Sequence, residues 1–335
     1  MEQIRLAKNG RETTRLGYGC SSIMGALGRR ESLRLLEAAF DAGIRHFDVA
    51  PMYGYGEAES CLGEFLERHR EAATVTTKYG IAPPKRGGLL RAARRVVGPA
   101  VGPIAKRVPA LKQWLARAAG AVAATASRSK FTAEEARASL EDSLRALRTG
   151  FIDVWLLHEA EAGDLGDEGL LRFLEDAVSQ GKIGSFGVGS ESAKIPALLR
   201  ERPAFCRVVQ HEWSVFDAAD AVGEAFHIHH RALTDNLGRL HERLTGSQEM
   251  CRRWNQQTGE DLSDRETLAG VMLKASLVVH PETVVLVSSK DASHIGDNVR
   301  VADDARLKEP ARRLYQLVQR EGVASAANLL PEERR

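Results

Sequence analysis

The strongest constraint on the fold of this chain is a repeated alternation between short apolar runs and amphipathic helical stretches. Eight apolar runs predict strands, with helical sequence after each. Such an order favours an α/β fold in which eight parallel strands close into a (β/α)8 barrel, or TIM barrel. The predicted strands are residues 16–20, 44–49, 74–78, 151–157, 183–188, 206–210, 226–230 and 284–287.

An open, doubly wound sheet is the main alternative to a barrel. Dinucleotide-binding folds of that kind carry a GxGxxG turn directly after the first strand. In this chain the first predicted strand leads into GYGCSSIMG, which lacks that spacing. The sequence therefore favours the barrel. We expect residues 1–323 to form a single domain, with a polar tail at 324–335.

A long extra segment, residues 81–130, separates the third predicted strand from a helix that begins near Thr132. Glu135 completes a capping box at that helix start. Three interpretations of the segment stay open: a solvated helical pair on the barrel rim, a basic lid that favours anionic substrates, or a helix that binds a membrane surface or nucleic acid. Between residues 81 and 133 there is no acidic residue, and the eleven basic residues are Lys85, Arg86, Arg91, Arg94, Arg95, Lys106, Arg107, Lys112, Arg117, Arg128 and Lys130.

Several classes of protein are not expected. No apolar run approaches the ~20 residues that span a bilayer, and the first residues lack the apolar region of a signal peptide. We expect no nucleic-acid partner. The sequence predicts a cytoplasmic protein with reduced thiols and no metal site, because its cysteines are far apart and lack metal-ligand spacing. These cysteines are Cys20, Cys61, Cys206 and Cys251.

Reactive side chains occur where the apolar runs stop. Asp48 ends the second predicted strand, and Tyr53 lies on the loop beyond it. Lys78 ends the third strand, His158 follows the fourth, and Gln210 ends the sixth. In a (β/α)8 barrel the active site is built at the carboxyl ends of the strands. We therefore expect these residues to meet in one site.

These residue types match the requirements of carbonyl reduction by hydride transfer. The alkoxide that forms needs a proton, and Tyr53 supplies one if its pKa falls from about 10 toward neutrality. Lys78 favours the phenolate, and Asp48 keeps the lysine charged and in place. His158 is suited to orient the carbonyl oxygen through a hydrogen bond. Each residue alone has a common structural explanation, so the prediction depends on the set of four.

Over residues 16–298 the chain resembles the aldo-keto reductase superfamily. The resemblance rests on the blocks FDVAPMYGYGEAES, TKYG, IDVWLLH, GKIGSFGVGS, VVQHEW and VLVSSKDASHIGDNVR. It implies an NADP-dependent oxidoreductase that acts on a small-molecule aldehyde, ketone, sugar lactol or alcohol. It also implies that Tyr53 is the acid/base, that Asp48 and Lys78 tune it, and that His158 orients substrate.

The resemblance further implies residues for the cofactor. Gln210 matches a glutamine that contacts the nicotinamide carboxamide. The usual Ser-Asn pair is Gly189-Ser190 here, and His230 lies near the usual stacking aromatic. A lysine beside a helix N-terminus attracts a 2′-phosphate, which favours NADPH over NADH. The predicted contacts to the adenosine phosphate are Ser289, Lys290, His294 and Asn298.

Two hypotheses of different class follow from the sequence. The first is an NAD(P)(H)-dependent oxidoreductase. The second is a nucleotide-binding regulatory or interaction subunit built on the same barrel, with little turnover. The four catalytic residue types favour the enzyme, and the altered cofactor positions keep the second hypothesis open. The oligomeric state is not predicted.

Overall fold

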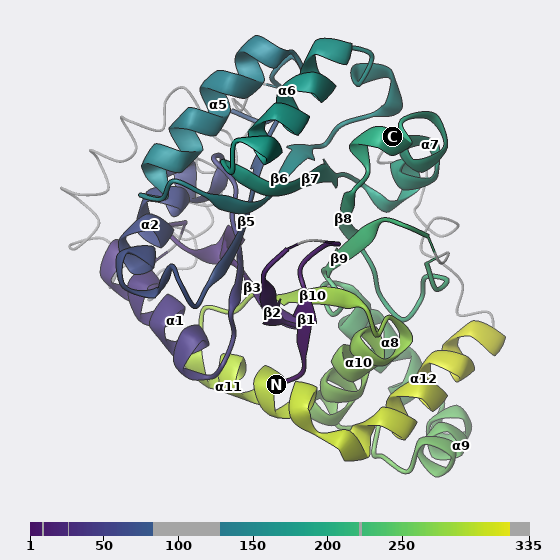
Figure 1. Ribbon diagram of the computed structural model, residues 1–335. Helices are drawn as coiled ribbons and strands as arrows, with labels where there is room; N and C mark the ends of the chain where they lie inside the picture. The colour runs from purple at the N-terminus through teal and green to yellow at the C-terminus, as the bar shows by residue number, and fades with distance from the viewer. Residues whose placement is uncertain (9, 26, 83–127, 221–222, 322–335) are drawn as a thin grey trace, which may run out of the picture.

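A computed structural model describes residues 1–8, 10–25, 27–82, 128–220 and 223–321. Eight parallel strands close into a barrel in the order β10-β3-β4-β5-β6-β7-β8-β9 (Figure 1). This confirms the predicted TIM barrel. The barrel strands are β3 Leu16–Gly19, β4 His46–Asp48, β5 Thr74–Tyr79, β6 Ile152–His158, β7 Ile183–Gly189, β8 Val208–Glu212, β9 Phe226–His230 and β10 Thr283–Val287.

An N-terminal hairpin, which the sequence analysis did not predict, closes one end of the barrel. Its strands β1, Gln3–Arg5, and β2, Glu12–Thr14, pair in antiparallel fashion and lie across the barrel centre in Figure 1. Leu6 in the hairpin turn is buried against barrel residues such as Val154 and Ile228. Because β2 leads directly into β3, the hairpin covers the amino-terminal ends of the strands.

The helices surround the barrel, and local sequence explains where they begin and end. The side chain of Thr132 accepts a hydrogen bond from the Glu135 backbone N–H, as the predicted capping box requires. The Glu135 carboxylate accepts from the Lys130 backbone N–H instead of closing the box on Thr132. The helices are α1 Arg29–Asp41, α2 Ala58–His69, α5 Ala133–Ala146, α6 Glu168–Ser179, α7 Ile195–Glu201, α8 Asn236–Thr245, α9 Gln248–Thr258, α10 Arg265–Val279, α11 Ala292–Asp303 and α12 Lys308–Arg320.

The region after β9 forms two helices, α8 and α9, because the chain turns at Gly246 and Ser247 caps α9 by accepting from the Met250 N–H. One helical prediction is wrong. The expectation that helical sequence follows every strand fails after β8, since residues 213–220 and 223–225 contain no helix. The outer face of β8 and β9 therefore lacks the usual helical cover from its own connection.

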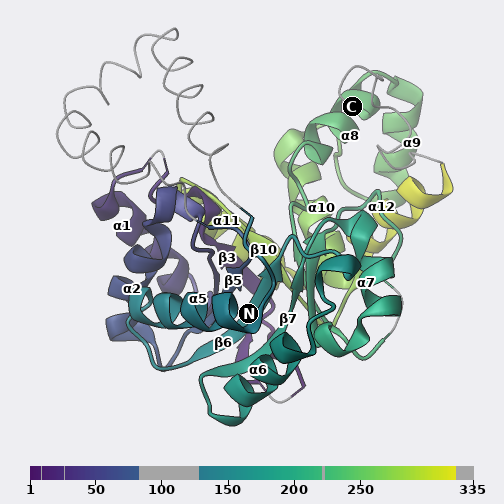
Figure 2. The same ribbon diagram turned by 90° about the horizontal axis from the view of Figure 1, so that it is seen from above.

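A second hydrophobic cluster lies outside the main core. Helices α8, α9, α10 and α12 pack around buried residues such as Trp254, Leu268 and Leu314. These helices form a group at one side of the barrel (Figure 2). The main cluster, which includes Phe47, Phe65 and further residues of the strands and inner helix faces, forms the layer between barrel and helices.

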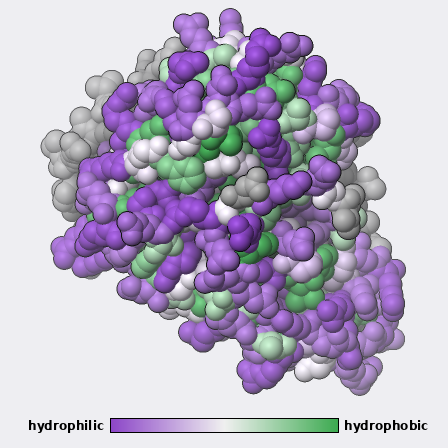
Figure 3. Space-filling model, viewed as in Figure 1, coloured by the Kyte–Doolittle hydropathy of each residue, from purple (hydrophilic) through white to green (hydrophobic). Residues whose placement is uncertain are grey.

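The described surface is mostly polar. The face seen in Figure 3 is largely hydrophilic, with hydrophobic side chains scattered in small groups. Among the described residues, Leu199 is the one large hydrophobic side chain in the exposed class, at 37%. None of the helices in the described part of the chain combines the length and the hydrophobicity needed to cross a membrane.

Most of the basic insertion, residues 83–127, and the predicted polar tail lie outside the described residues. The two ends of the insertion meet: Ile81 and Arg128 form an antiparallel bridge, and the Ser129 N–H donates to the Gly80 carbonyl at 2.8 Å. The chain therefore leaves the barrel and returns to it at nearly the same point. The division into one domain, an insertion and a tail stays a prediction.

We predict that the barrel folds without residues 83–127. Because the flanking residues already pair, a short Gly-Ser turn should bridge the same gap, as in ordinary strand-to-helix connections. The shortened protein should unfold in one cooperative transition with a Tm within about 5 °C of the full chain, measured by circular dichroism. Failure to obtain folded protein would mean that the segment belongs to the core.

Candidate active site

A cavity of about 430 Å³ lies at the carboxyl ends of the barrel strands. Every strand of the barrel contributes to its wall, as the strand-end argument predicts. The contributing strand residues, in the order β3 to β10, are Gly19, Asp48, Lys78, His158, Gly189, Gln210, His230 and Val287.

Lys78 and Asp48 form a buried ion pair at the cavity floor. The Lys78 Nζ lies 2.6 Å from the Asp48 Oδ1 and also donates to the Val49 carbonyl at 3.1 Å. Both side chains are about 5% exposed or less. Burial lowers the pKa of Lys78, but the charges of Asp48 and Tyr53 outweigh burial, and the net pKa is raised above its ordinary value. Lys78 is therefore a cation at neutral pH.

Tyr53 lies above this pair on the short η2 turn, Tyr53–Gly56. Left-handed backbone at Gly54 and Tyr55, with φ of 58° and 59°, bends the chain so that the Tyr53 ring meets the cavity. A Cβ at position 54 would lie 2.5 Å from the Met24 Cβ, so this position requires glycine. The Lys78 Nζ lies 5.2 Å from the centre of the Tyr53 ring.

The pKa of Tyr53 differs from the expected shift toward neutrality. Burial raises the pKa above 10.0, and the nearby Lys78 ammonium opposes that rise without overcoming it. Tyr53 is therefore a protonated phenol at neutral pH in the protein alone. This is the form that donates a proton.

His158 lies beside Tyr53, with ring centres 6.4 Å apart and the rings nearly perpendicular, at 88°. Burial and then the Lys78 charge lower the pKa of His158 to about 3, so the imidazole is neutral at pH 7. Its Nδ1 is buried with no hydrogen-bond partner among the described residues. A neutral imidazole therefore lines the cavity, with its Nδ1 buried behind the cavity wall.

The predicted nicotinamide contacts also line the cavity. Gln210 donates its side-chain N–H to the Asp48 Oδ2 at 2.7 Å, which leaves its carbonyl oxygen as the atom suited to accept from a ligand. The Ser190 hydroxyl donates to the Ala160 carbonyl at 3.0 Å. Burial lowers the pKa of His230 to about 3, so its ring is uncharged at neutral pH.

The predicted adenosine-phosphate residues divide into two groups. Asn298, on α11, lines the cavity. Ser289, Lys290 and His294 do not line it; they lie at the start of α11, directly after the cavity residues Val287 and Ser288. Lys290 and His294 are exposed. The structure thus places a cationic side chain next to one edge of the cavity, beside a helix N-terminus.

Carboxylates at the cavity mouth were missed by the sequence analysis. Glu159, Glu191 and Glu212 line the cavity together with Arg231. Burial and the neighbouring Glu191 raise the pKa of Glu159. The Arg231 Nε lies 3.1 Å from the Glu212 Oε1. The strand-end argument could have found both, because Glu159 directly follows His158 and Glu212 lies two residues after Gln210.

Comparison with known proteins assigns the family of the chain. The model of the aldo/keto reductase family matches residues 15–230, which include the Asp48, Tyr53, Lys78 and His158 positions. The chain belongs to the aldo-keto reductase family. The match begins at β3 and ends with β9, so it covers most of the barrel.

Two curated relatives are similar to parts of this aldo-keto reductase. D-threo-aldose 1-dehydrogenase of a Pseudomonas species is 33% identical over 187 residues, which cover 52% of this chain and 49% of that protein. Pyridoxal 4-dehydrogenase of Microbacterium luteolum is 43% identical over 82 residues, or 24% of each chain. The chain thus spans about half or less of the length of these curated relatives.

Solved structures of other aldo-keto reductases share the fold over the whole chain. The holo form of an aldo-keto reductase from Bacillus halodurans has a TM-score of 0.66 at 17% identity, with 100% of both chains covered. An aldo-keto reductase from Klebsiella pneumoniae in complex with NADPH has a TM-score of 0.59 at 19% identity, with 94% of this chain and 96% of that chain covered. At such identities the likeness concerns the fold alone.

A buried histidine, His46, lies beneath the active-site pair of this aldo-keto reductase. It occupies the same face of β4 as Asp48, because side chains two residues apart share a face. Its ring nitrogens lie 3.0 Å from the Thr74 hydroxyl and 3.3 Å from the Thr76 hydroxyl. Burial and then the Lys78 charge lower the pKa of His46 to about 3. The barrel interior therefore holds a neutral imidazole.

We predict that His46 makes the fold sensitive to acid. Its folded-state pKa of about 3 lies below the unfolded value near 6.5, so its stabilising effect is complete above pH 6.5 and is lost as the pH falls toward 3. Between pH 7 and pH 5 His46 should account for a loss of about 2 kcal/mol in the free energy of unfolding.

Urea unfolding at both pH values tests this prediction. His46→Asn should lose about 2 kcal/mol less than the wild type over that interval. The control is His241→Asn, whose hydrogen bond to the Ser263 carbonyl is solvent-exposed. Equal pH dependence in His46→Asn and the wild type would contradict the role of His46.

Proposed function

We propose that this protein catalyses hydride transfer between NADP(H) and a carbonyl or alcohol carbon, with Tyr53 as the general acid/base. The observation that carries the proposal is the cluster at the cavity floor: a buried Lys78–Asp48 ion pair, Tyr53 above it and a neutral His158 beside it. These four residues come from four separate segments. Their convergence in one cavity supports a shared chemical role.

The environment of Tyr53 suits proton transfer in both directions. In reduction, the protonated phenol gives its proton to the oxygen on which negative charge develops. The phenolate that remains is stabilised by the Lys78 cation, whose charge is retained because the Asp48 carboxylate lies 2.6 Å away. In oxidation, the same phenolate takes the proton of the alcohol.

His158 and Gln210 are suited to position the reacting groups. The neutral His158 can donate one N–H to the substrate oxygen without adding a charge that would compete with Lys78. Gln210 bonds Asp48 through its N–H, so a ligand held by its carbonyl oxygen is fixed relative to the ion pair.

The residues around the cavity fit a nicotinamide dinucleotide. When bound, the cofactor supplies or accepts the hydride. We propose that Ser190, Gln210 and His230 hold its nicotinamide end, with His230 as a neutral stacking surface. Asn298 lines the cavity edge and Lys290 lies exposed beside it, so the phosphate end would meet a cation and the N-terminus of α11.

We propose a small polar substrate that carries hydroxyl groups, such as a sugar lactol or a hydroxylated aldehyde. The described mouth carries Glu159, Glu191, Glu212 and Arg231, which are suited to bind hydroxyl groups. Relatives named as an aldose dehydrogenase and a pyridoxal dehydrogenase agree with this substrate class. The interpretation of the basic insertion as a lid that favours anionic substrates stays open, and assays of the shortened protein with charged and neutral substrates at two salt concentrations test it.

We predict that Tyr53→Phe lowers kcat by about 10²–10⁴-fold or more while leaving the Kd for NADPH nearly unchanged. The substitution removes the proton donor and keeps the ring. The measurement is NADPH oxidation with a panel of aldoses, hydroxylated aldehydes and aryl aldehydes, with NADPH binding followed by nicotinamide fluorescence. The matched control is Tyr315→Phe. Tyr315 lies on α12, outside the cavity, and its hydroxyl donates to the Asp217 carbonyl.

A near-normal kcat in Tyr53→Phe would rule out its role as acid/base. If the wild type binds NADPH but oxidises it with no member of the panel, the result would favour the nucleotide-binding subunit instead.

We predict that the protein binds NADPH more tightly than NADH, and that Lys290→Ala narrows the difference. A lost charge-assisted bond to the 2′-phosphate costs about 1.5–3 kcal/mol, or roughly 10- to 150-fold in Kd, and solvent exposure of Lys290 favours the lower value. Lys182→Ala, at the opposite end of the barrel beside Glu141, is the control. Equal wild-type affinity for NADH and NADPH would contradict the phosphate site.

A further inference from the structure

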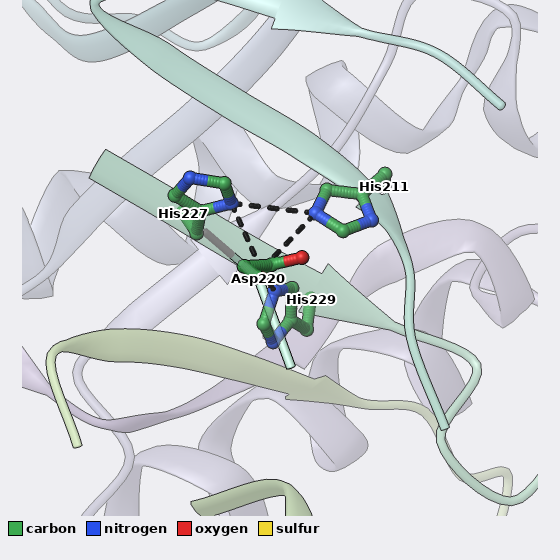
Figure 4. A group of neighbouring side chains, drawn as sticks. All are labelled: His211, Asp220, His227 and His229. Carbon is green, nitrogen blue, oxygen red and sulfur yellow. Dashed lines mark hydrogen bonds and ion pairs between the residues drawn. The ribbon is translucent and has the colours of Figure 1, made fainter. Parts of the chain in front are cut away.

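A cluster of three histidines and one aspartate lies outside the active-site cavity. His211 on β8 and His227 and His229 on β9 surround the Asp220 carboxylate (Figure 4). One ligand atom from each of the four residues lies within 4.8 Å of every other. The cavity and the mechanism use none of these side chains, and the sequence analysis predicted no metal site here.

Successive side chains of a strand point to opposite faces, and this alternation places the cluster and the active site on different faces of β8 and β9. Gln210 and His230 line the cavity, so their neighbours His211 and His229 point to the outer face of the barrel. Ile228 packs inside the barrel, which places His227 on the outer face with His229. The cluster thus occupies the outer face of β8 and β9, where the connection between these strands provides no helix in its described part.

Three of the six distances between the four ligand atoms match those of a tetrahedral site, and the contact between Asp220 and His229 is shorter, at hydrogen-bond length. The Asp220 Oδ2 lies 3.4 Å from the His211 Nε2, 3.1 Å from the His227 Nδ1 and 2.6 Å from the His229 Nε2. The His211 Nε2 lies 3.3 Å from the His227 Nδ1. Zinc bonds of 2.0–2.1 Å in a tetrahedron place neighbouring ligand atoms about 3.3 Å apart.

Hydrogen bonding alone leaves one unfavourable contact in this cluster. The His211 Nδ1 lies 3.0 Å from the Glu212 carbonyl oxygen, and an N–H must fill that contact because a carbonyl only accepts. A neutral His211 then has a bare Nε2 lone pair that can accept from the His227 Nδ1 at 3.3 Å but also lies 3.4 Å from the Asp220 Oδ2, which is a second acceptor. A metal cation would accept these lone pairs. The carbonyl bond also fixes the tautomer that a metal-bound histidine needs.

The surroundings hold the ligands in place. The His229 side chain is 0% exposed, and its ring stacks on Trp213, with centres 5.8 Å apart and planes 20° apart. The His280 ring packs edge-on against His229 at 4.6 Å. Side-chain exposure is 5% for His211 and 19% for Asp220, so the Asp220 side is the most accessible. The ligands are thus largely pre-organised, and Asp220 is the most exposed of them.

We propose that His211, Asp220, His227 and His229 bind one divalent transition-metal ion, with zinc(II) as the best match. Three imidazoles and one carboxylate are ligands that zinc accepts, whereas magnesium and calcium prefer oxygen ligands. Four protein ligands complete a tetrahedron, which is typical of structural and not catalytic zinc. The ion would tie the segment that carries Asp220 to the outer face of β8 and β9.

Zinc binding to protein without a histidine tag tests the proposal. The protein is stripped with EDTA, dialysed and titrated with zinc chloride by calorimetry, and its Tm is measured with and without zinc. We expect one zinc per chain and a Tm rise of roughly 3–6 °C at a zinc concentration a hundred times the Kd. Cobalt(II) should give the intense visible absorption typical of four-coordinate sites.

Two variants and one control assign the site. Asp220→Asn and His227→Gln should each weaken zinc binding by at least about tenfold, since even loss of an outer hydrogen-bond partner of a metal ligand costs that much. His241→Gln removes a histidine on α8, outside the cluster, and should bind zinc like the wild type.

Three results would overturn the proposal: no stoichiometric zinc binding by the wild type, equal binding by the wild type and both variants, or loss of binding in His241→Gln. If either variant fails to fold, the cobalt spectrum of the wild type decides whether the site is tetrahedral. Weak absorption typical of six-coordinate cobalt would then exclude the tetrahedral site, and the cluster would be a hydrogen-bonded one with a protonated His211.

Discussion

The buried ion pair between Lys78 and Asp48 is the interaction on which the site depends. A lysine enclosed in a barrel interior would tend to lose its proton, because burial disfavours the charged form. Asp48 prevents this at a separation of 2.6 Å, and the Val49 carbonyl accepts a second hydrogen bond from the same ammonium. The retained charge then affects each titratable group around it.

The Lys78 charge acts to lower the pKa of neighbouring groups. It opposes the rise in the pKa of Tyr53, and it adds to burial in lowering the pKa of His158 and His46. The imidazoles of His158 and His46 near the Lys78 cation are therefore both neutral at pH 7. Among the described residues, the electrostatic support of Lys78 for a phenolate is therefore not shared with a protonated His158 or His46.

The sequence predicted those parts of the fold and the site that follow from periodicity. Strand 226–230 was predicted at its observed bounds, and strand ends identified Asp48, Lys78, His158 and Gln210 around one cavity. The sign of the Tyr53 pKa shift was not predictable, because it is the balance of burial against one nearby charge. The N-terminal hairpin was missed because its strands of three residues are too short for a periodic signal.

The histidine cluster illustrates a different limit of sequence reasoning. Strand pairing places His211 opposite His229, but Asp220 comes from the connection between the strands, and only the folded chain brings its carboxylate to the rings. A barrel strand normally covers its outer face with an apolar side chain and a helix. Here the connection after β8 supplies Trp213 and an aspartate in place of a helix in its described part, and the outer face of β9 is histidine at both positions. Polar residues at such positions remain buried only if something satisfies them. The hydrogen bonds of the cluster satisfy all but one of its close contacts, that of the His211 Nε2 with the Asp220 Oδ2, and the proposed cation would lie between these two acceptors.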